Sequence, residues 1–165
     1  MNELIKNRRS VREFSGERVS DEVIMEIVRA AMQAPSAKNG QPWLIHIEKN
    51  PEVIRKMSEE FPNLKFGHNA AFVLVFLMNL NAPIPVMAPQ DMSACVTMAL
   101  LEAEHQGLGA CWGGTYPREE RMNQARRVFN LYGENYVPFA IVPMGPVVNK
   151  DAYRFVDRFD EGKLV

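Results

Sequence analysis

Apolar residues recur with a helical period in several stretches of the chain. Between Ser20 and Ala34 they return every three to four residues, which predicts an amphipathic helix with one face in the core. Ser20 is a suitable N-cap, and Pro35 ends the helix because the residue before a proline is pushed out of the α region. Further helices are expected over residues 2–9, with Leu4 and Ile5 inward, and over 51–60 and 117–130.

Short continuous apolar runs form a second pattern and predict the strands. Residues 71–78, AFVLVFLM, are apolar throughout and rich in β-forming side chains, as in a central strand that is covered on both faces. Other strands are expected at 43–47 and 138–144, and residues 109–115 are expected to form a strand or a strand followed by a turn. This order of helices and strands indicates an α+β fold in which helices cover a sheet.

The segment 90–106 predicts the longest helix, and its apolar residues surround the helix axis almost completely. A helix with this pattern is buried on all sides. Gly107 suits the position after its last turn, where a left-handed backbone closes the helix. Such a helix needs much covering surface in a chain of 165 residues. A second copy of the chain is the simplest source of that cover, although the core of a monomer could also provide it.

The bulk composition is that of one globular domain spanning residues 1–165. Hydrophobic residues make up 47% of the chain and charged residues 24%, the balance of an ordinary soluble protein. The formal net charge of −1 gives no electrostatic footprint for nucleic acid. The longest apolar run, 92–101, is about half the length of a membrane span, so no membrane association is expected.

The two cysteines, Cys95 and Cys111, predict neither a disulfide framework nor a metal site. Both lie in apolar runs, and neither has a Cys or His at metal-ligand spacing. Free cysteine in such surroundings behaves as a small hydrophobic residue. The first ten residues also lack the apolar core of a signal peptide. We therefore expect a reducing, cytoplasmic location.

Basic residues cluster near the start of the chain at Arg8, Arg9 and Arg12, together with the hydroxyl of Ser10. Guanidinium forks and a hydroxyl suit a phosphate group, which accepts charge-assisted, bidentate hydrogen bonds. The alternative interpretation is a solvated basic end of a helix. These residues alone favour that alternative.

Two further segments hold candidate site residues. The loop 36–42, SAKNGQP, presents neutral hydrogen-bonding groups at Ser36, Asn39 and Gln41, although a polar turn anchored by Trp43 would look the same. The glycines at 107, 109, 113 and 114 do not form a dinucleotide fingerprint, because they follow a helix instead of opening one.

Three segments in this order resemble the nitroreductase family of FMN enzymes. They are NRRSVREF at 7–14, APSAKNGQPW at 34–43, and the stretch 91–114 that contains LLEAEHQGLGACWGG. The tail DRFD at 157–160 resembles the C-terminal end of the family. The resemblance covers nearly the whole chain. It implies a nitroreductase-like α+β fold, with a central, mostly antiparallel sheet covered by helices and an intertwined homodimer.

The resemblance also implies roles for individual residues. The first motif is expected to contact the phosphate and ribityl chain of FMN, and Arg12 to stabilise the negative charge that reduction leaves at the flavin N1–O2 edge. The loop is expected to reach the flavin held mainly by the other subunit, and the backbone near Gly114 to approach N5. The expected cofactor-binding residues are Arg8, Arg9, Ser10, Arg12, Pro35, Ser36, Ala37, Asn39, Gln41, Asn63, Gly113, Gly114, Thr115 and Arg158. Gly113 and Thr115 depart from the usual family pattern of a branched apolar residue and of Gly or Ala.

The function implied by the resemblance is electron transfer from NAD(P)H to a small-molecule acceptor such as a nitroaromatic or a quinone. One open pocket would serve both half-reactions in a ping-pong mechanism, with no catalytic side chain because the flavin supplies the reactive atom. Relatives of this fold also dehalogenate iodotyrosine, desaturate rings or fragment flavin. A non-enzymatic flavin-binding or regulatory protein is a further alternative, and steady-state NADPH oxidation would separate it from an enzyme.

Overall fold

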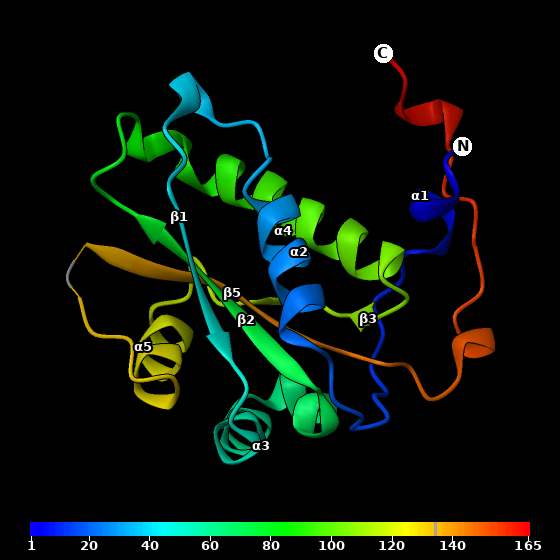
Figure 1. Cartoon of the computed structure of the whole chain (residues 1–165). Helices are drawn as coiled ribbons and strands as arrows, with labels where there is room; N and C mark the ends of the chain where they lie inside the picture. The colour runs from blue at the N-terminus through cyan, green and yellow to red at the C-terminus, as the bar shows by residue number, and fades with distance from the viewer. Residues whose placement is uncertain (134) are drawn as a thin grey trace.

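A five-stranded antiparallel sheet separates two layers of helices in the computed structural model, which describes residues 1–133 and 135–165 (Figure 1). The strand order is β1-β2-β5-β3, and β4 pairs with β5 beside this path. The predicted, mostly antiparallel sheet is therefore confirmed. The strands are β1 (Trp43–Glu48), β2 (Phe72–Asn79), β3 (Gly109–Ala110), β4 (Gly113–Gly114) and β5 (Tyr136–Gly145).

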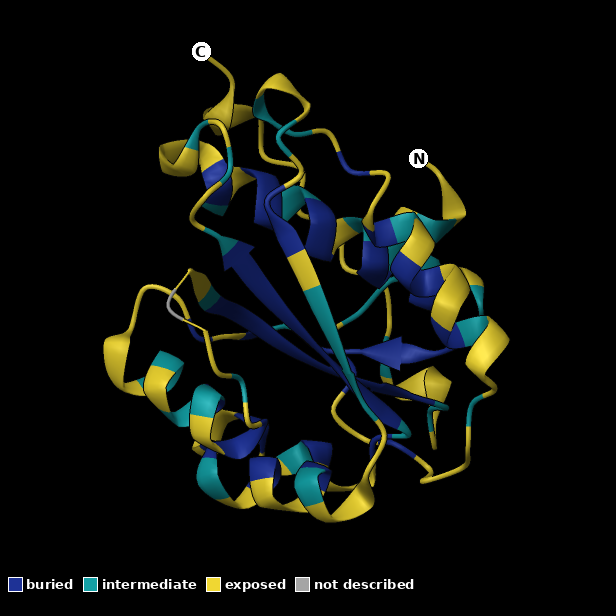
Figure 2. Ribbon diagram, turned by 60° about the vertical axis from the view of Figure 1, so that its left-hand side comes forward, coloured by how far each residue is buried: buried dark blue, intermediate teal, exposed yellow. Residues whose placement is uncertain are grey.

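The central strand β2 divides the core into two halves. Successive side chains of a strand point to opposite faces of the sheet. Phe72, Leu74 and Phe76 accordingly pack with α2 and α4, whereas Val73 and Val75 pack with α3 and α5. Seven of the eight residues of β2 are buried, as the apolar run predicted, and Figure 2 shows the dark, buried strands between the helix layers.

The helices cover both faces of the sheet, with α2 and α4 on one face and α3 and α5 on the other (Figure 1). The helices are α1 (Glu3–Asn7), α2 (Asp21–Ala31), α3 (Pro51–Glu60), α4 (Ala88–His105) and α5 (Glu119–Val128). Short 3₁₀ segments are η1 (Ala37–Asn39), η2 (Pro62–Asn69), η3 (Pro85–Met87), η4 (Lys150–Ala152) and η5 (Glu161–Lys163). None of the described helices has the length and apolarity needed to cross a bilayer.

The N-cap predicted for α2 is confirmed, because the Ser20 hydroxyl accepts a hydrogen bond from the Val23 N–H at 3.4 Å. The helix ends at Ala31, three residues earlier than predicted. The backbone closes there with short turn bonds, such as the one from Gln33 N–H to the Ala30 carbonyl at 3.1 Å. Pro35 therefore follows a turn that has already ended the helix.

The first helix is shorter than predicted. The prediction that both Leu4 and Ile5 face inward is wrong for Ile5. The helix covers Glu3–Asn7, and Arg8 leaves it with an extended ψ of 123°. Leu4 is half-buried, but Ile5 is 55% exposed. A five-residue helix presents only one narrow face to its support, so two adjacent apolar residues cannot both lie on that face.

The prediction that the long helix is buried on all sides is wrong for the single chain. Helix α4 buries one broad face, which includes Met92, Val96 and Leu100. On its other face Thr97 is exposed and Met98 is only half-buried. The helices α3 and α5 cannot cover this face, because the sheet lies between them and α4. The Gly107 prediction is confirmed, since its φ of 75° closes the helix.

Candidate functional site

The basic segment from Arg8 to Arg12 runs in extended form beside β3. Ser10 forms a parallel bridge with Ala110, and the Val11 N–H donates to the Ala110 carbonyl at 3.0 Å. Side chains of an extended segment alternate between its two sides. Residues 8, 10 and 12 therefore face one way, and residues 9 and 11 face the other.

The even-numbered side chains lie on the side of the segment that faces the thiol of Cys111. Burial raises the pKa of Cys111, and Arg12, Ser10 and Arg8 oppose that rise through their charges and a hydrogen bond. All three groups therefore lie near enough to the thiol to influence its ionisation. The structure thus brings together three of the predicted phosphate-binding residues. Cys111 itself is buried and free, and the raised pKa keeps its thiol neutral.

Arg9 lies apart from this group, and its predicted contact with FMN stays a prediction. Its Nε donates to the Arg154 carbonyl at 3.0 Å, and its Nη1 donates to the Arg8 carbonyl at 2.6 Å. Its guanidinium carbon lies 5.4 Å from the centre of the Phe155 ring, a cation–π contact. The side chain of Arg9 therefore points toward the C-terminal segment and away from Cys111.

Two residues absent from the sequence prediction hold Arg12 in place. The hydroxyl of Tyr153 accepts the Arg12 backbone N–H at 2.9 Å. The ring of Phe66 lies below the guanidinium, with 5.8 Å between the ring centre and Cζ, and Nη1 donates to the Ser10 carbonyl at 3.2 Å. Within the described chain no carboxylate forms an ion pair with Arg12, so its charge is available to a ligand.

The three predicted residues of the segment 113–115 have different environments. Gly113 is buried against Leu64, and Thr115 is 1% exposed, with its hydroxyl donating to the Pro138 carbonyl at 2.8 Å. The Thr115 N–H is also engaged, at 3.1 Å from the Phe139 carbonyl. Gly114 is exposed, with open space where a Cβ would stand. Gly114 is therefore the position of this segment that a ligand can approach.

Substituting these two glycines tests the local geometry. We expect Gly113→Ala to lower the free energy of unfolding by about 1–3 kcal/mol, as overpacking does in well-packed cores. The new Cβ would lie 2.6 Å from Leu64 Cδ2 and 3.0 Å from the Ile141 carbonyl oxygen, and that carbonyl belongs to β5. Gly114→Ala is the matched control because its Cβ meets nothing within 4 Å. Urea unfolding measures both variants, and equal midpoints for the two would contradict this packing.

The segment η2 connects the arginine cluster to the glycines. Its Phe66 lies under Arg12, and its Leu64 packs against Gly113. The predicted contact residue Asn63 is exposed on the same segment, directly before Leu64. Asn63 therefore lies near the group that contains Arg12 and Gly114.

The loop 35–41, which overlaps the predicted loop 36–42, has an ordered, unusual backbone. Lys38, Asn39 and Gln41 all have positive φ, of 48°, 53° and 44°. Ser36 accepts the Gln41 N–H at 3.0 Å, and the Gln41 amide donates to Asn39 Oδ1 at 3.0 Å. Non-glycine residues in this region are strained and occur preferentially at functional sites. Pro35 and Asn39 are exposed and accessible to a ligand.

This loop and the arginine cluster lie at opposite ends of α4 (Figure 1). The loop is attached near the start of the helix, where the Ala37 N–H donates to Asp91 Oδ1 at 3.1 Å. The segment that carries Arg9 lies beside Glu104, near the end of the helix. With a rise of about 1.5 Å per residue, Asp91 and Glu104 are roughly 20 Å apart along the axis. One chain therefore does not bring both groups of predicted residues to one small ligand.

The remaining candidates lie at the ends of the site. Arg158 is exposed in the tail, beyond the part of the tail that contacts Arg9 and Arg12, and its role stays a prediction.

Arg121 on α5 was not predicted, yet its Nη1 donates to the Gly114 carbonyl at 3.3 Å. Helical periodicity places Arg121 on a polar face and gives no sign of this contact, which depends on how α5 packs against β4.

Comparison with known sequences gives a consistent set of relatives. Residues 5–78 match the model of the "Nitroreductase family". A protein of Archaeoglobus fulgidus, named "Putative NADH dehydrogenase/NAD(P)H nitroreductase", is 40% identical over 164 residues. The alignment covers 98% of this chain and 94% of that protein.

Solved structures have the same fold. A crystal structure from Clostridium acetobutylicum, named "Putative NADH Oxidase", superimposes with a TM-score of 0.91 at 38% identity and covers 98% of this chain and 97% of that one. An "FMN-dependent Nitroreductase" of Clostridium difficile superimposes with a TM-score of 0.87, covering 98% of this chain and 96% of that one. Its identity is 22%, so this second similarity bears on the fold alone.

Proposed function

The chain belongs to the nitroreductase family, and from that premise we propose that it is an FMN-dependent oxidoreductase that transfers two electrons from NAD(P)H to small acceptors. The acceptors proposed are nitroaromatics, quinones and similar molecules, reduced in a ping-pong mechanism. One observation carries the proposal: Arg8, Ser10 and Arg12 converge beside Cys111, next to a backbone that is open at Gly114. The two free, buried thiols also favour a cytoplasmic location.

The residues present fit FMN better than FAD. The guanidinium fork of Arg8 and the hydroxyl of Ser10 match a terminal phosphate, and the glycines lack the dinucleotide pattern that would hold an adenosine half. The open space above Gly114 allows a planar ring to approach the backbone. When bound, FMN supplies the atom that accepts and donates the electron pair, so the chain needs no general acid or base for that step.

The role proposed for Arg12 is to hold a fixed positive charge at the electron-rich edge of the ring system. Its guanidinium is oriented by the Ser10 carbonyl and the Phe66 ring before any ligand arrives. A preorganised charge stabilises developing negative charge without reorganisation. Arg12 therefore raises the reduction potential of the bound cofactor.

The Arg12→Gln variant tests this role. We expect it to retain part of its FMN binding, because Arg8 and Ser10 remain, but to have a lower midpoint potential than the parent protein. Loss of one fixed charge removes the electrostatic stabilisation of the reduced state. Potentiometric titration of the fully loaded proteins measures the change. An unchanged midpoint potential would mean that Arg12 serves elsewhere, most simply on the phosphate.

We further propose a homodimer in which two copies of the chain share each FMN. The loop 35–41 lies too far from the Arg8 cluster to complete one site within a chain. A second copy could bring its own loop to the cluster. The half-exposed face of α4 around Met98 provides apolar surface for such an interface. Met25 on α2 and Met32 directly after that helix, each 42% exposed, add to this surface.

The purified protein provides the direct test of the proposed function. We expect flavin absorption bands, a heat-released flavin that runs with FMN on chromatography, and steady-state NAD(P)H oxidation with menadione or nitrofurazone. Parallel initial-rate lines would support the ping-pong order. Released FAD would reject the cofactor. Bound FMN without turnover would favour a flavin-binding or regulatory protein, and activity only with a halogenated or cyclic substrate would favour a dehalogenase or desaturase.

A further inference from the structure

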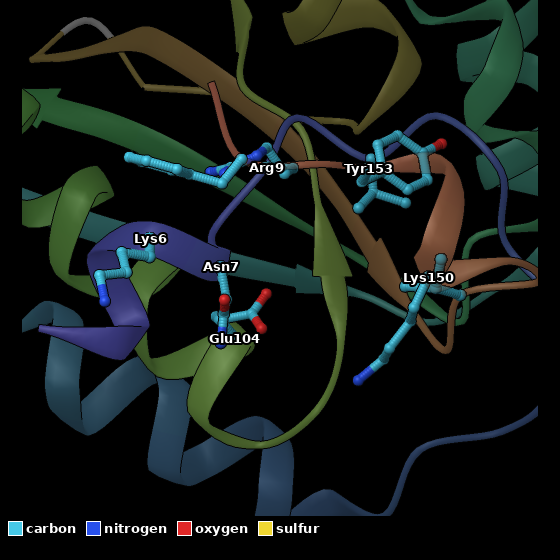
Figure 3. A pocket seen from close by; sticks show the side chains of 9 residues that line it. Lys6, Asn7, Arg9, Glu104, Lys150 and Tyr153 are labelled. Carbon is cyan, nitrogen blue, oxygen red and sulfur yellow. The ribbon is translucent and has the colours of Figure 1, made fainter. Parts of the chain in front are cut away.

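A cavity of about 300 Å³ lies on the side of the Arg8–Arg12 segment that faces away from Cys111. No part of the proposed reaction uses it. Lys6 and Asn7 of α1 form one wall, Glu104 of α4 lies at the centre, and the C-terminal segment forms the opposite wall. Figure 3 shows Lys6 and Lys150 on opposite sides of Asn7 and Glu104, with Tyr153 above Lys150.

The charges of the cavity favour an anion. Lys6, Arg9 and Lys150 contribute three cations from three separate segments, against the single carboxylate of Glu104. Lys6 also pairs with Glu3 outside the lining, at 2.6 Å. Arg9 is held in place by the Arg154 carbonyl and the Phe155 ring, so its charge is fixed before a ligand binds. Concave sites with one dominant sign of charge concentrate ligands of the opposite sign.

The carboxylate and the aromatic rings of the cavity restrict the class of ligand that fits it. A carboxylate inside a basic cavity repels an anion unless the ligand also carries hydrogen-bond donors for it. Ribose hydroxyls are such donors, and acidic side chains accept them in nucleotide sites. Tyr153 and Phe155 add aromatic surface on which a planar base can stack. The volume of about 300 Å³ lies at the lower end of the range for small-ligand pockets.

We propose that this cavity binds a nucleoside monophosphate group. The positive charges of Lys6, Arg9 and Lys150 attract the phosphate, the ribose hydroxyls donate to Glu104, and the base lies against Tyr153. The group is either a free mononucleotide or the adenylate half of NAD(P)H, and only this second source rests on the proposed function.

Tyr153 connects the cavity to the proposed flavin site. Tyr153 lines the cavity, and its hydroxyl accepts the backbone N–H of Arg12 at 2.9 Å. A ligand that packs against Tyr153 therefore affects the position of the Arg12 segment. We expect ligand binding to change the visible spectrum of the bound flavin.

Calorimetric titration of the FMN-saturated protein with AMP, adenosine and inorganic phosphate tests the proposal. AMP is expected to bind at least about tenfold more tightly than adenosine, since a charge-assisted hydrogen bond contributes about 1.5–3 kcal/mol. Lys6→Gln and Lys150→Gln should each weaken AMP binding about five- to tenfold. Lys56→Gln, on the exposed face of α3, makes the same change of charge and should have no effect. Glu104→Gln should strengthen phosphate binding but reduce the preference for AMP over phosphate.

Inhibition kinetics distinguish the two sources. AMP that competes with NAD(P)H, together with a raised KM for NAD(P)H in Lys150→Gln, identifies the dinucleotide. AMP that changes turnover without competing identifies a free nucleotide. The inference is overturned if AMP does not bind, if it binds Lys6→Gln and Lys150→Gln as tightly as the parent, or if added FMN displaces it. The titration needs no turnover, so its failure in an active enzyme leaves the proposed function intact.

Discussion

Arg8→Ala protein is expected to bind FMN about tenfold to a hundredfold more weakly than the parent chain, because a hydrogen bond to a charged group contributes about 1.5–3 kcal/mol. Arg8 is half-buried, directly follows α1 and lies close enough to influence the Cys111 thiol, so its guanidinium is already confined. Removing it leaves the phosphate with Ser10 alone on this side, since Arg12 is proposed to lie at the edge of the ring system. Quenching of flavin fluorescence during titration of the apoprotein gives the dissociation constant.

Two variants separate the geometry of Arg8 from its charge. Arg8→Lys retains the charge but loses the planar fork, so its affinity should lie between those of the parent and Arg8→Ala. Arg127→Ala removes an exposed arginine of α5 and should leave FMN affinity unchanged. Thermal unfolding of the apoproteins checks that all variants are folded. If Arg8→Ala binds FMN as well as Arg127→Ala does, Arg8 is not a phosphate ligand.

Co-expression of Arg8→Ala and Asn39→Ala chains is expected to restore activity that neither variant has alone. In the proposed shared site, these residues belong to opposite walls contributed by different copies. Each homodimer carries two damaged sites, whereas a mixed dimer carries one site with both defects and one with neither. Mixed dimers should therefore regain up to about half the FMN content and turnover of the parent. Differently tagged chains allow the mixed dimer to be purified and assayed.

The same experiment can reject the shared site in two ways. Light scattering of the holoprotein at micromolar concentration should show a dimer, because obligate interfaces are large. A monomeric holoprotein would exclude sharing altogether. Absence of rescue in confirmed mixed dimers, with both single variants folded but weak, would place Arg8 and Asn39 in the same chain's half of the pocket.

Elements governed by local patterns were predictable from the sequence. Helix α3 has the predicted bounds, since Pro51 at its first turn and the alternation of buried and exposed positions are local properties. Strand β2 was recognisable because a run of eight apolar residues between turns has few other uses in an α+β fold. In both cases the sequence neighbours alone decide the conformation.

Features that depend on distant partners were not predictable. The segment after α1 is extended because it pairs with Ala110, and this pairing places Arg9 on the side opposite Ser10. Without knowledge of that partner, the sequence RRS is typical of a basic helix end and does not indicate which side chains face the same way. The supports of Arg12 come from Phe66 and Tyr153, which are far from it in sequence and carry no motif. Folding brings these side chains together, and no spacing in the sequence indicates their contacts.

The backbone of the loop 35–41 has a thermodynamic consequence for any ligand that it contacts. Lys38, Asn39 and Gln41 adopt left-handed conformations, which cost about 1–2 kcal/mol for a residue with a side chain, and less for asparagine. Packing of the loop and its bond to Asp91 maintain this shape in the free chain. The entropy of ordering the loop is thus lost during folding, so a ligand gains its contacts without a further entropic penalty. If the loop contacts FMN as proposed, its ordered shape favours binding at the expense of global stability.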